Sequence, residues 1–276
     1  MSNETASEVS MTEKARQAVR ERYGTIARSN DNCCTGDHVD TNAGNQSCCD
    51  TTTSGTGSER LGYDDQDIAA VAEGADLGLG CGNPGAFANM RHGETVLDLG
   101  AGAGFDCFLA AQEVGTGGRV IGVDMTPDMV SKARENVSKN DVSNVEFRLG
   151  EIAHLPVADE IVDVIISNCV INLAPEKRQV FADSFRVLKP GGRIAISDVV
   201  QTAPFPDDVE SDPSFFSRCV TGAATIESLD SMLSDVGFEE IVIEPTANSS
   251  EFISDWDETR DLSTYLVSAT IQARKP

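Results

Sequence analysis

The chain has 276 residues, enough for one large α/β domain with appendages or for two small domains. Lysine and arginine total 21 against 45 acids, so the formal net charge of −24 argues against binding to a phosphate backbone. Acids spread along a whole chain are typical of a cytosolic protein from a salt-accumulating halophile, with a merely acidic mesophilic protein as the alternative.

No apolar run approaches the roughly 18 residues of a membrane span, and the first ten residues lack the basic and apolar regions of a signal peptide. We therefore expect a cytoplasmic protein with neither a membrane nor a nucleic acid as partner. Eight cysteines are many for a reducing compartment. There they point to metal or redox chemistry before structural disulfides.

The N-terminal 60 residues are expected to form a helix, over 13–27, followed by a flexible segment without a core. Residues 29–58 are mostly polar or glycine. They carry two vicinal cysteine pairs, Cys33-Cys34 and Cys48-Cys49. These spacings do not match a zinc knuckle, and vicinal cysteines rarely bond to each other. Capture of a soft metal or thiol exchange is therefore favoured, with inert surface thiols as the alternative.

A short helix is predicted over 63–74, and the glycine-dense loop LGLGCGNPGAFAN follows at 77–89. This loop comes directly before the first strand of the predicted sheet. It could therefore lie across the mouth of a ligand site. Cys81, at its centre, is a candidate functional residue.

The stretch TVLDLGAGAG, residues 95–104, predicts a buried strand that runs into a glycine-rich turn. A helix over 105–114 follows, so its N-terminal amides would point at a bound ligand. The dinucleotide-binding fingerprint is excluded because Phe105 stands where its third glycine would be. The pattern D-x-G-x-G-x-G instead resembles the first motif of class I S-adenosylmethionine-dependent methyltransferases. By itself, such a turn could also close an ordinary βα unit.

The second strand, over 119–124, ends in Asp124, about 20 residues past the last glycine, where a doubly wound fold holds ribose hydroxyls. Alternating strands and helices then continue to the end of the chain. Strands are expected at 144–149, 161–167, 193–197, 239–244 and 265–273, helices at 127–140, 177–188 and 226–236, and a turn at 189–192. The chain thus predicts an α/β doubly wound, seven-stranded sheet over 61–276, with insertions at 201–224 and 246–262.

Three cysteines are expected on the same rim of this sheet: Cys81, Cys169 and Cys219. Cys169 follows the fourth strand, and ligands of open α/β sheets bind outside the carboxyl ends of the strands. Three thiolates without a histidine or carboxylate partner select a soft, thiophilic centre. A trivalent arsenical has three sulfur ligands and a lone pair that could attack a methyl carbon without a general base. Cys107 is most simply a core residue.

From about residue 23 to its end, the chain resembles the arsenite S-adenosylmethionine methyltransferase family. The stretches that carry the likeness are Tyr23-Gly24 with Cys33-Cys34, LGLGCGNP, VLDLGAGAGFD, GVDMTPDM, GEIAHLPV, SNCVINL, VLKPGGR, CVTGA and EFISDW. The resemblance implies the class I methyltransferase fold and the methylation of arsenite for detoxification, here in a halophilic archaeon.

By that resemblance, Cys169 and Cys219 hold the arsenic, while Cys81 exchanges on and off it with an N-terminal partner, Cys33 or Cys34. The extra pair Cys48-Cys49 leaves that partner open. The implied cofactor site comprises Asp98, Gly100, Gly102, Gly104, Asp124, Met125, Glu151, Ile152 and Asn168. Arsenite and methylarsenite would be the substrates, and a small thiol or thioredoxin the reductant. A monomer is expected.

Two other functions stay open at this stage. A class I methyltransferase acting on a small organic or lipid substrate would share the fold, but it leaves the three cysteines unexplained. A non-catalytic metalloid-binding protein would use the thiols, but it leaves the intact glycine motif unexplained.

Overall fold

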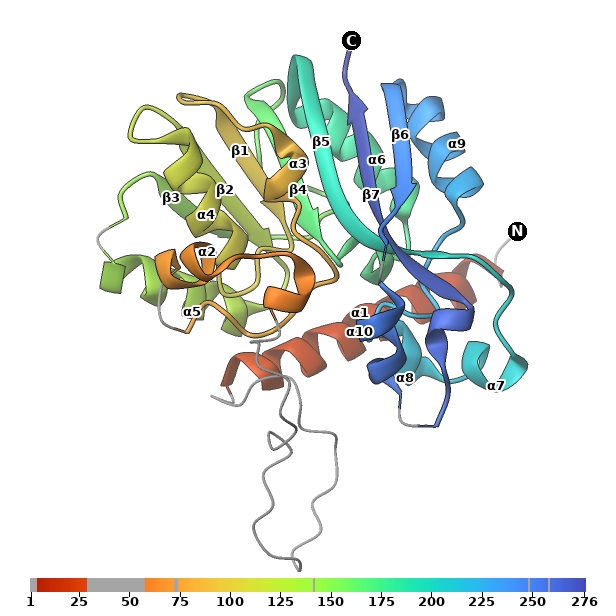
Figure 1. Ribbon diagram of the computed structural model, residues 1–276. Helices are drawn as coiled ribbons and strands as arrows, with labels where there is room; N and C mark the ends of the chain where they lie inside the picture. The colour runs from red at the N-terminus through yellow and green to blue at the C-terminus, as the bar shows by residue number, and fades with distance from the viewer. Residues whose placement is uncertain (1–3, 29–57, 72–73, 141, 248, 258) are drawn as a thin grey trace, which may run out of the picture.

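The computed structural model describes residues 4–28, 58–71, 74–140, 142–247, 249–257 and 259–276. A seven-stranded sheet in the order β3-β2-β1-β4-β5-β7-β6 forms its centre (Figure 1). The strands are β1 (Thr95–Leu99), β2 (Arg119–Asp124), β3 (Val145–Leu149), β4 (Val162–Asn168), β5 (Leu188–Gln201), β6 (Glu239–Pro245) and β7 (Leu266–Arg274). Only β7 runs antiparallel to its neighbours, β5 and β6. The predicted doubly wound, seven-stranded α/β sheet is confirmed.

Helices cover both faces of the sheet. The main helices are α1 (Glu4–Arg28), α4 (Phe105–Val114), α5 (Pro127–Asn140), α6 (Lys177–Val187) and α9 (Ile226–Val236). Shorter ones are η1 (Glu59–Leu61), α2 (Asp65–Ala70), α3 (Gly85–Ala88), η2 (Ile171–Leu173), α7 (Asp207–Glu210), α8 (Pro213–Phe216), α10 (Ser250–Ile253), η3 (Ser254–Trp256) and η4 (Leu262–Thr264). No helix within the described ranges is long and apolar enough to cross a membrane.

The alternation of side chains along β1 divides the core into two layers. Val96 belongs to the cluster that includes Cys107 and Val130, from α4 and α5. Leu97 and its neighbours on that side pack with Phe181 of α6 and with residues of α9. Because both faces of the sheet are covered, the central strands β1 and β4 carry mostly buried, apolar side chains.

The strand order places the site at a topological switch point. The chain moves outward through β2 and β3 on one side of β1, and through β4 and β5 on the other. The loops after β1 and β4 therefore leave the sheet side by side, where a crevice opens in folds of this kind. Helix α1 lies across this end of the sheet and packs against α5 (Figure 1).

Three predicted elements differ most in the structure. The helix expected over 13–27 spans Glu4–Arg28. The turn expected at 189–192 is part of β5, with a register break opposite Val162 and Val164. The tract is drawn into the sheet because Lys189 binds the Asp163 carboxylate at 2.7 Å and Gly191 donates its N–H to the carbonyl of Lys275 at 2.8 Å. The helix expected over 63–74 spans only Asp65–Ala70.

Candidate active site

A single cavity of about 1110 Å³ opens at the switch point. Its lining falls into two parts. The cofactor half consists of residues at the ends of β1, β2 and β3, including residues 100–103 of the glycine turn, whereas Gly104 does not line the cavity. The thiol half consists of Cys81, Cys169 and Cys219 with their immediate surroundings, and both Cys169 and Cys219 line the cavity. Cys81 is buried directly beneath.

The glycine turn of the cofactor half depends on backbone shapes that other residues rarely adopt. Gly100, Gly102 and Gly104 have φ values of +71°, +51° and +99°. A Cβ on Gly100 would stand 2.4 Å from the Val170 side chain, whereas one on Gly102 would meet no atom within 4 Å. The turn therefore packs tightly on one side and leaves open space on the cavity side.

Asp124 closes the turn from the neighbouring strand, where the sequence placed it. Its carboxylate accepts hydrogen bonds from the N–H of Gly102 at 3.0 Å and of Thr126 at 2.8 Å. Burial raises its pKa, which these bonds partly offset. The carboxylate is thus held at the cavity wall, where its remaining lone pairs suit ribose hydroxyls.

Two further carboxylates line the cofactor half, those of Asp98 and Asp106. Burial, followed by the negative charge of Asp106, raises the pKa of Asp98 well above its usual value. Burial also raises the pKa of Asp106 to about 6, although hydrogen bonds with Tyr63 and Asn168 lower it. Three carboxyl groups at one cavity suit a ligand that carries positive charge.

Tyr63 and Asp106 had no place in the predicted site. The hydroxyl of Tyr63, which is 4% exposed, donates to the Asp106 carboxylate at 2.7 Å. The short α2 explains how it gets there, since Asp64 caps that helix and Tyr63 lies before it and turns inward. The pattern of residues 63–74 had placed this tyrosine inside a helix, which concealed its role.

The predicted adenine-side residues, Glu151 and Ile152, both line the cavity, as does Met125. Glu151 also binds helix α1, because Arg20 donates to its carboxylate at 2.7 Å and the Nε of Arg16 lies 3.2 Å from it. Helix α1 is thereby attached to the rim of the cofactor half, a contact that no sequence motif indicated.

In the thiol half, Cys81 is fixed by its backbone. Its N–H donates to the side-chain oxygen of Asn168 at 2.9 Å, and its carbonyl accepts from the Ser268 hydroxyl at 2.7 Å. The flanking glycines are needed for close approach, since a Cβ on Gly82 would stand 2.7 Å from the Ser197 hydroxyl oxygen. The glycine-dense loop therefore packs Cys81 against the ends of β4, β5 and β7.

Asn168 connects the two halves of the cavity. Its side-chain oxygen accepts from the N–H of Cys81. Its amide nitrogen donates to the Gly82 carbonyl at 2.7 Å and to the Tyr63 hydroxyl oxygen at 2.9 Å. The same nitrogen is 3.4 Å from the carboxylate of Asp106. It was predicted as a cofactor-binding residue and does line the cavity. Its hydrogen bonds, however, go to the Cys81 loop and to the Tyr63-Asp106 pair.

Cys169 and Cys219 both occupy the left-handed backbone region, at φ +58° and +64°. Cysteine rarely adopts this conformation, and each case costs about 1–3 kcal/mol. The Cys219 thiol points to the carbonyl oxygen of Cys169, with a sulfur–oxygen distance of 3.0 Å. Strain at two neighbouring thiols is typical of residues that are placed for function.

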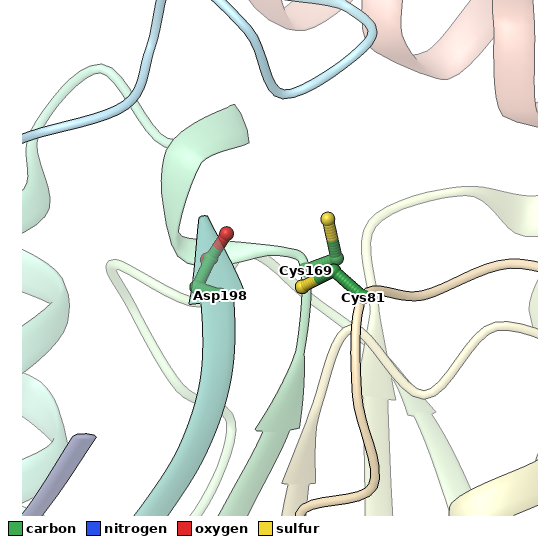
Figure 2. A group of neighbouring side chains, drawn as sticks. All are labelled: Cys81, Cys169 and Asp198. Carbon is green, nitrogen blue, oxygen red and sulfur yellow. The ribbon is translucent and has the colours of Figure 1, made fainter. Parts of the chain in front are cut away.

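A carboxylate lies beside the thiols, although the sequence predicts three thiolates without a carboxylate partner. The Sγ atoms of Cys81 and Cys169 and a carboxylate oxygen of Asp198 all lie within 4.8 Å of one another. Figure 2 shows the three side chains where the Cys81 loop, the end of β4 and β5 meet. Asp198 is only 2% exposed. The expectation of three thiols without a carboxylate partner was therefore wrong.

The three thiols favour their protonated form in this environment. Burial is the main cause that raises the pKa of Cys81. A hydrogen bond with Cys169 and burial raise the pKa of Cys219 well above its usual value. The pKa of Cys169 is also raised well above its usual value. A hydrogen bond with Cys219 lowers this pKa, but the hydrogen bond with Cys81 and burial together outweigh that effect. Without a bound metalloid these groups are thiols and poor nucleophiles.

The remaining cysteines divide into two groups. Cys107 is fully buried in α4 and donates its thiol to the Asp98 carboxylate at 3.2 Å, so it is a core residue as expected. Cys33, Cys34, Cys48 and Cys49 lie outside the described residues. The division of the chain at residue 60 likewise stays a prediction.

Comparison with known proteins identifies the family. A family model described as a methyltransferase domain matches residues 90–237. An arsenite methyltransferase from Halobacterium salinarum is 67% identical over 264 residues, which are 96% of this chain and 67% of that protein. The chain belongs to the arsenite methyltransferase family. This relative also fits the expected halophilic archaeal origin.

Other members of the arsenite methyltransferase family agree over shorter spans. The mouse arsenite methyltransferase is 36% identical over 58% of this chain and 44% of its own length. An X-ray structure of an arsenic(III) S-adenosylmethionine methyltransferase from Chlamydomonas reinhardtii matches with a TM-score of 0.59 and 32% identity, over 79% of this chain and 72% of that one. The chain thus spans about two thirds of its Halobacterium relative and less than half of the mouse one.

Proposed function

We propose that this chain methylates trivalent arsenic while the thiolates of Cys81, Cys169 and Cys219 hold it, with the methyl group drawn from S-adenosylmethionine in the cofactor half. One observation carries this proposal. Three thiols from distant segments surround one end of a cavity whose other end is formed by the glycine turn and three carboxylates. The two halves meet at Asn168.

The raised pKa values of the thiols are compatible with arsenite as substrate. Arsenite carries three hydroxyl groups, and each arsenic–sulfur bond that forms joins one thiol proton to one hydroxide, which leaves as water. No free thiolate has to exist beforehand, because coordination itself deprotonates the thiol. Sulfur ligands also match a soft centre better than oxygen or nitrogen would.

The cofactor half fits S-adenosylmethionine by charge and by space. Asp98, Asp106 and Asp124 place three carboxyl groups at the cavity, and the sulfonium and ammonium groups of the ligand would favour their ionised form. The open side of Gly102 leaves room for the ligand to approach the backbone. S-adenosylmethionine supplies, when bound, an electrophilic methyl group.

The protein's part in the transfer is to hold and aim the arsenic. Three sulfur ligands leave one lone pair on arsenic, which forms the bond to carbon as the carbon–sulfonium bond breaks. No proton is removed in this step, so no general base is needed. Arsenic loses two electrons formally, and two thiols that join as a disulfide return them. We infer that Cys81 with Cys33 or Cys34, and a small thiol or thioredoxin, supply these thiols.

The test is arsenite binding by single variants of the full chain. Cys81→Ser, Cys169→Ser and Cys219→Ser should each weaken binding of arsenite, measured by equilibrium dialysis with elemental detection. Cys107→Ser is the matched control, since it removes a buried thiol that lies outside the thiol half, beside Asp98. Undiminished binding in any of the three variants would contradict the proposed ligand set.

A further inference from the structure

Asp198 has no task in the arsenic chemistry described above. A trivalent arsenical is complete with three sulfur ligands, and the methyl transfer needs no base. Yet this carboxylate is buried beside Cys81 and Cys169, within 4.8 Å of both sulfur atoms. Burial raises its pKa to about 6 even though backbone hydrogen bonds and the charge of Lys177 lower it, so placing an ionisable group there is costly.

We propose that Cys81, Cys169 and Asp198 form a binding site for a thiophilic divalent cation such as Zn²⁺ or Cd²⁺. Two sulfurs and one carboxylate oxygen are ligands that Zn²⁺ takes readily, with a fourth position for water or another donor. Tetrahedral coordination places such ligand atoms about 3.5–3.8 Å apart. The ligand atoms of the cluster, drawn in Figure 2, lie within 4.8 Å of one another, which is close to that spacing.

The surroundings of Asp198 resemble the outer shell of a metal site. One carboxylate oxygen accepts from the Asn172 amide at 2.8 Å and from the Val199 N–H at 2.8 Å. The other accepts a longer bond, of 3.3 Å, from the Asn172 N–H, and a backbone bond from Ile171 also lowers the pKa of this carboxyl. The Asp198 carboxylate is therefore held in place by its neighbours. Hydrogen bonds of this kind orient carboxylates that coordinate metals.

Charge around the cluster also permits a dication. The positive charge of Lys177 lowers the pKa of Asp198, and burial lowers the pKa of Lys177 itself. It donates to the carbonyl of Ala174 and forms no ion pair within the described part of the chain. Two thiolates and a carboxylate carry three negative charges, so they outweigh it. Cys169 lines the cavity and gives the cation a path inward.

Arsenic and the cation would then compete, because both need Cys81 and Cys169. They differ in their use of Asp198, which the divalent cation coordinates and the arsenical does not require. The competition rests on the proposed function, but binding of the cation does not.

The experiment uses Cd²⁺ alone as probe, in chloride-free sodium sulfate. The parent protein is the full chain with serine at Cys33, Cys34, Cys48 and Cys49, so that these thiols cannot bind the probe. We expect one Cd²⁺ per chain and an ultraviolet thiolate-to-cadmium charge-transfer band. Asp198→Asn should weaken binding by about tenfold or more. Cys107→Ser, made in the same parent, should bind as the parent does.

A second variant separates loss of the ligand from damage to β5. Asp198→Glu keeps a carboxylate and should bind Cd²⁺ more tightly than Asp198→Asn. Equal affinities in those two variants, or unchanged affinity in Asp198→Asn, would overturn the carboxylate ligand. Binding without the charge-transfer band would overturn the thiolate ligands.

Added arsenite distinguishes this inference from the proposed function. Displacement of Cd²⁺ by arsenite supports a shared pair of thiols. Bound Cd²⁺ that arsenite fails to displace would uphold the metal site and contradict the arsenic site instead.

Discussion

The two halves of the cavity are built in different ways. The cofactor half comes mainly from one continuous stretch, in which the glycine turn after β1 is closed by Asp124 from the adjacent strand. The thiol half is assembled from segments that are far apart in the chain, around residues 81, 169, 198 and 219. A local motif therefore defines the first half, whereas only the strand order brings the second together.

The difference also appears in what each half costs the fold. Both halves hold carboxyl groups whose pKa values burial raises, Asp98 and Asp106 in the cofactor half and Asp198 in the thiol half. They differ in the left-handed backbone region, which the cofactor half fills with glycines and the thiol half with Cys169 and Cys219. Such costs are tolerated when surrounding structure fixes the residues, as the Ser197 carbonyl does by accepting from the Cys169 N–H and as the Asn172 amide does by donating to Asp198.

The largest effect expected is a variant that loses methylation completely but keeps its affinity for the cofactor. Cys219→Ser should reduce methylation of every trivalent arsenical to background, because one sulfur ligand is missing. Its affinity for S-adenosylmethionine, measured by calorimetry, should equal that of the wild type. Retained turnover would remove Cys219 from the site, and a lost cofactor affinity would show that the halves are not separable.

A second change tests the cost carried by the cofactor half. The folded-state pKa of Asp106, about 6, lies above the ordinary value of 3.8, so its ionised form destabilises the fold. That cost is absent below about pH 4 and grows to about 3 kcal/mol above pH 6. The free energy of unfolding of the wild type should therefore fall by this amount, from this group, as pH rises through that window.

Denaturant titrations of wild type and Asp106→Asn across that window measure this dependence. The variant cannot ionise there, so its stability should fall less steeply with pH. Equal slopes in both proteins would contradict the raised pKa.

A third change tests whether the cofactor half can be weakened without any effect on the thiol half. Asp124→Ala removes the hydrogen bonds expected to ribose, so the dissociation constant of S-adenosylmethionine should rise by roughly tenfold, or about 1.4 kcal/mol. Arsenite binding, measured by dialysis, should stay as in the wild type. An unchanged cofactor constant would remove Asp124 from this role.

The smallest effect concerns helix α1 and the rim of the cofactor half. Arg20→Gln breaks a partly exposed ion pair with Glu151, so cofactor affinity should fall by no more than about threefold at low salt. In molar salt the difference should vanish, because exposed charges are screened. Arg28→Gln is the control, since it breaks the pair with Asp128 on the same helix. A loss that persists in molar salt would show that Arg20 contacts the ligand directly.

Much of the fold could be predicted from the sequence because its signals are local. Hydrophobic runs bounded by glycine and proline gave the limits of α4, α5 and α9 as the structure has them. The tract at 189–192 was predicted as a turn because it contains a proline and two glycines. Its pairing with Lys275, which makes it part of β5, is a contact across the sheet that no local pattern indicates.

In the site as well, residues with a local sequence signal could be predicted, whereas residues placed by tertiary contacts could not. The glycine turn and Asp124 have a fixed spacing, and the three cysteines carry unusual chemistry. Asp198 gave no signal, because one acid among 45 at the end of a strand is ordinary in this chain. The bridging bonds of Asn168 follow from tertiary packing alone, as does the inward turn of Tyr63.

The central claim is that the thiol half and the cofactor half form one active site. The most direct test incubates the purified protein at high salt with arsenite, a reduced thiol and S-adenosylmethionine, and separates the arsenic species by chromatography with element-specific detection. We predict methylated arsenic that increases with the amount of enzyme and is lost in Cys169→Ser. Arsenite that binds to the wild type but is never methylated would contradict the claim.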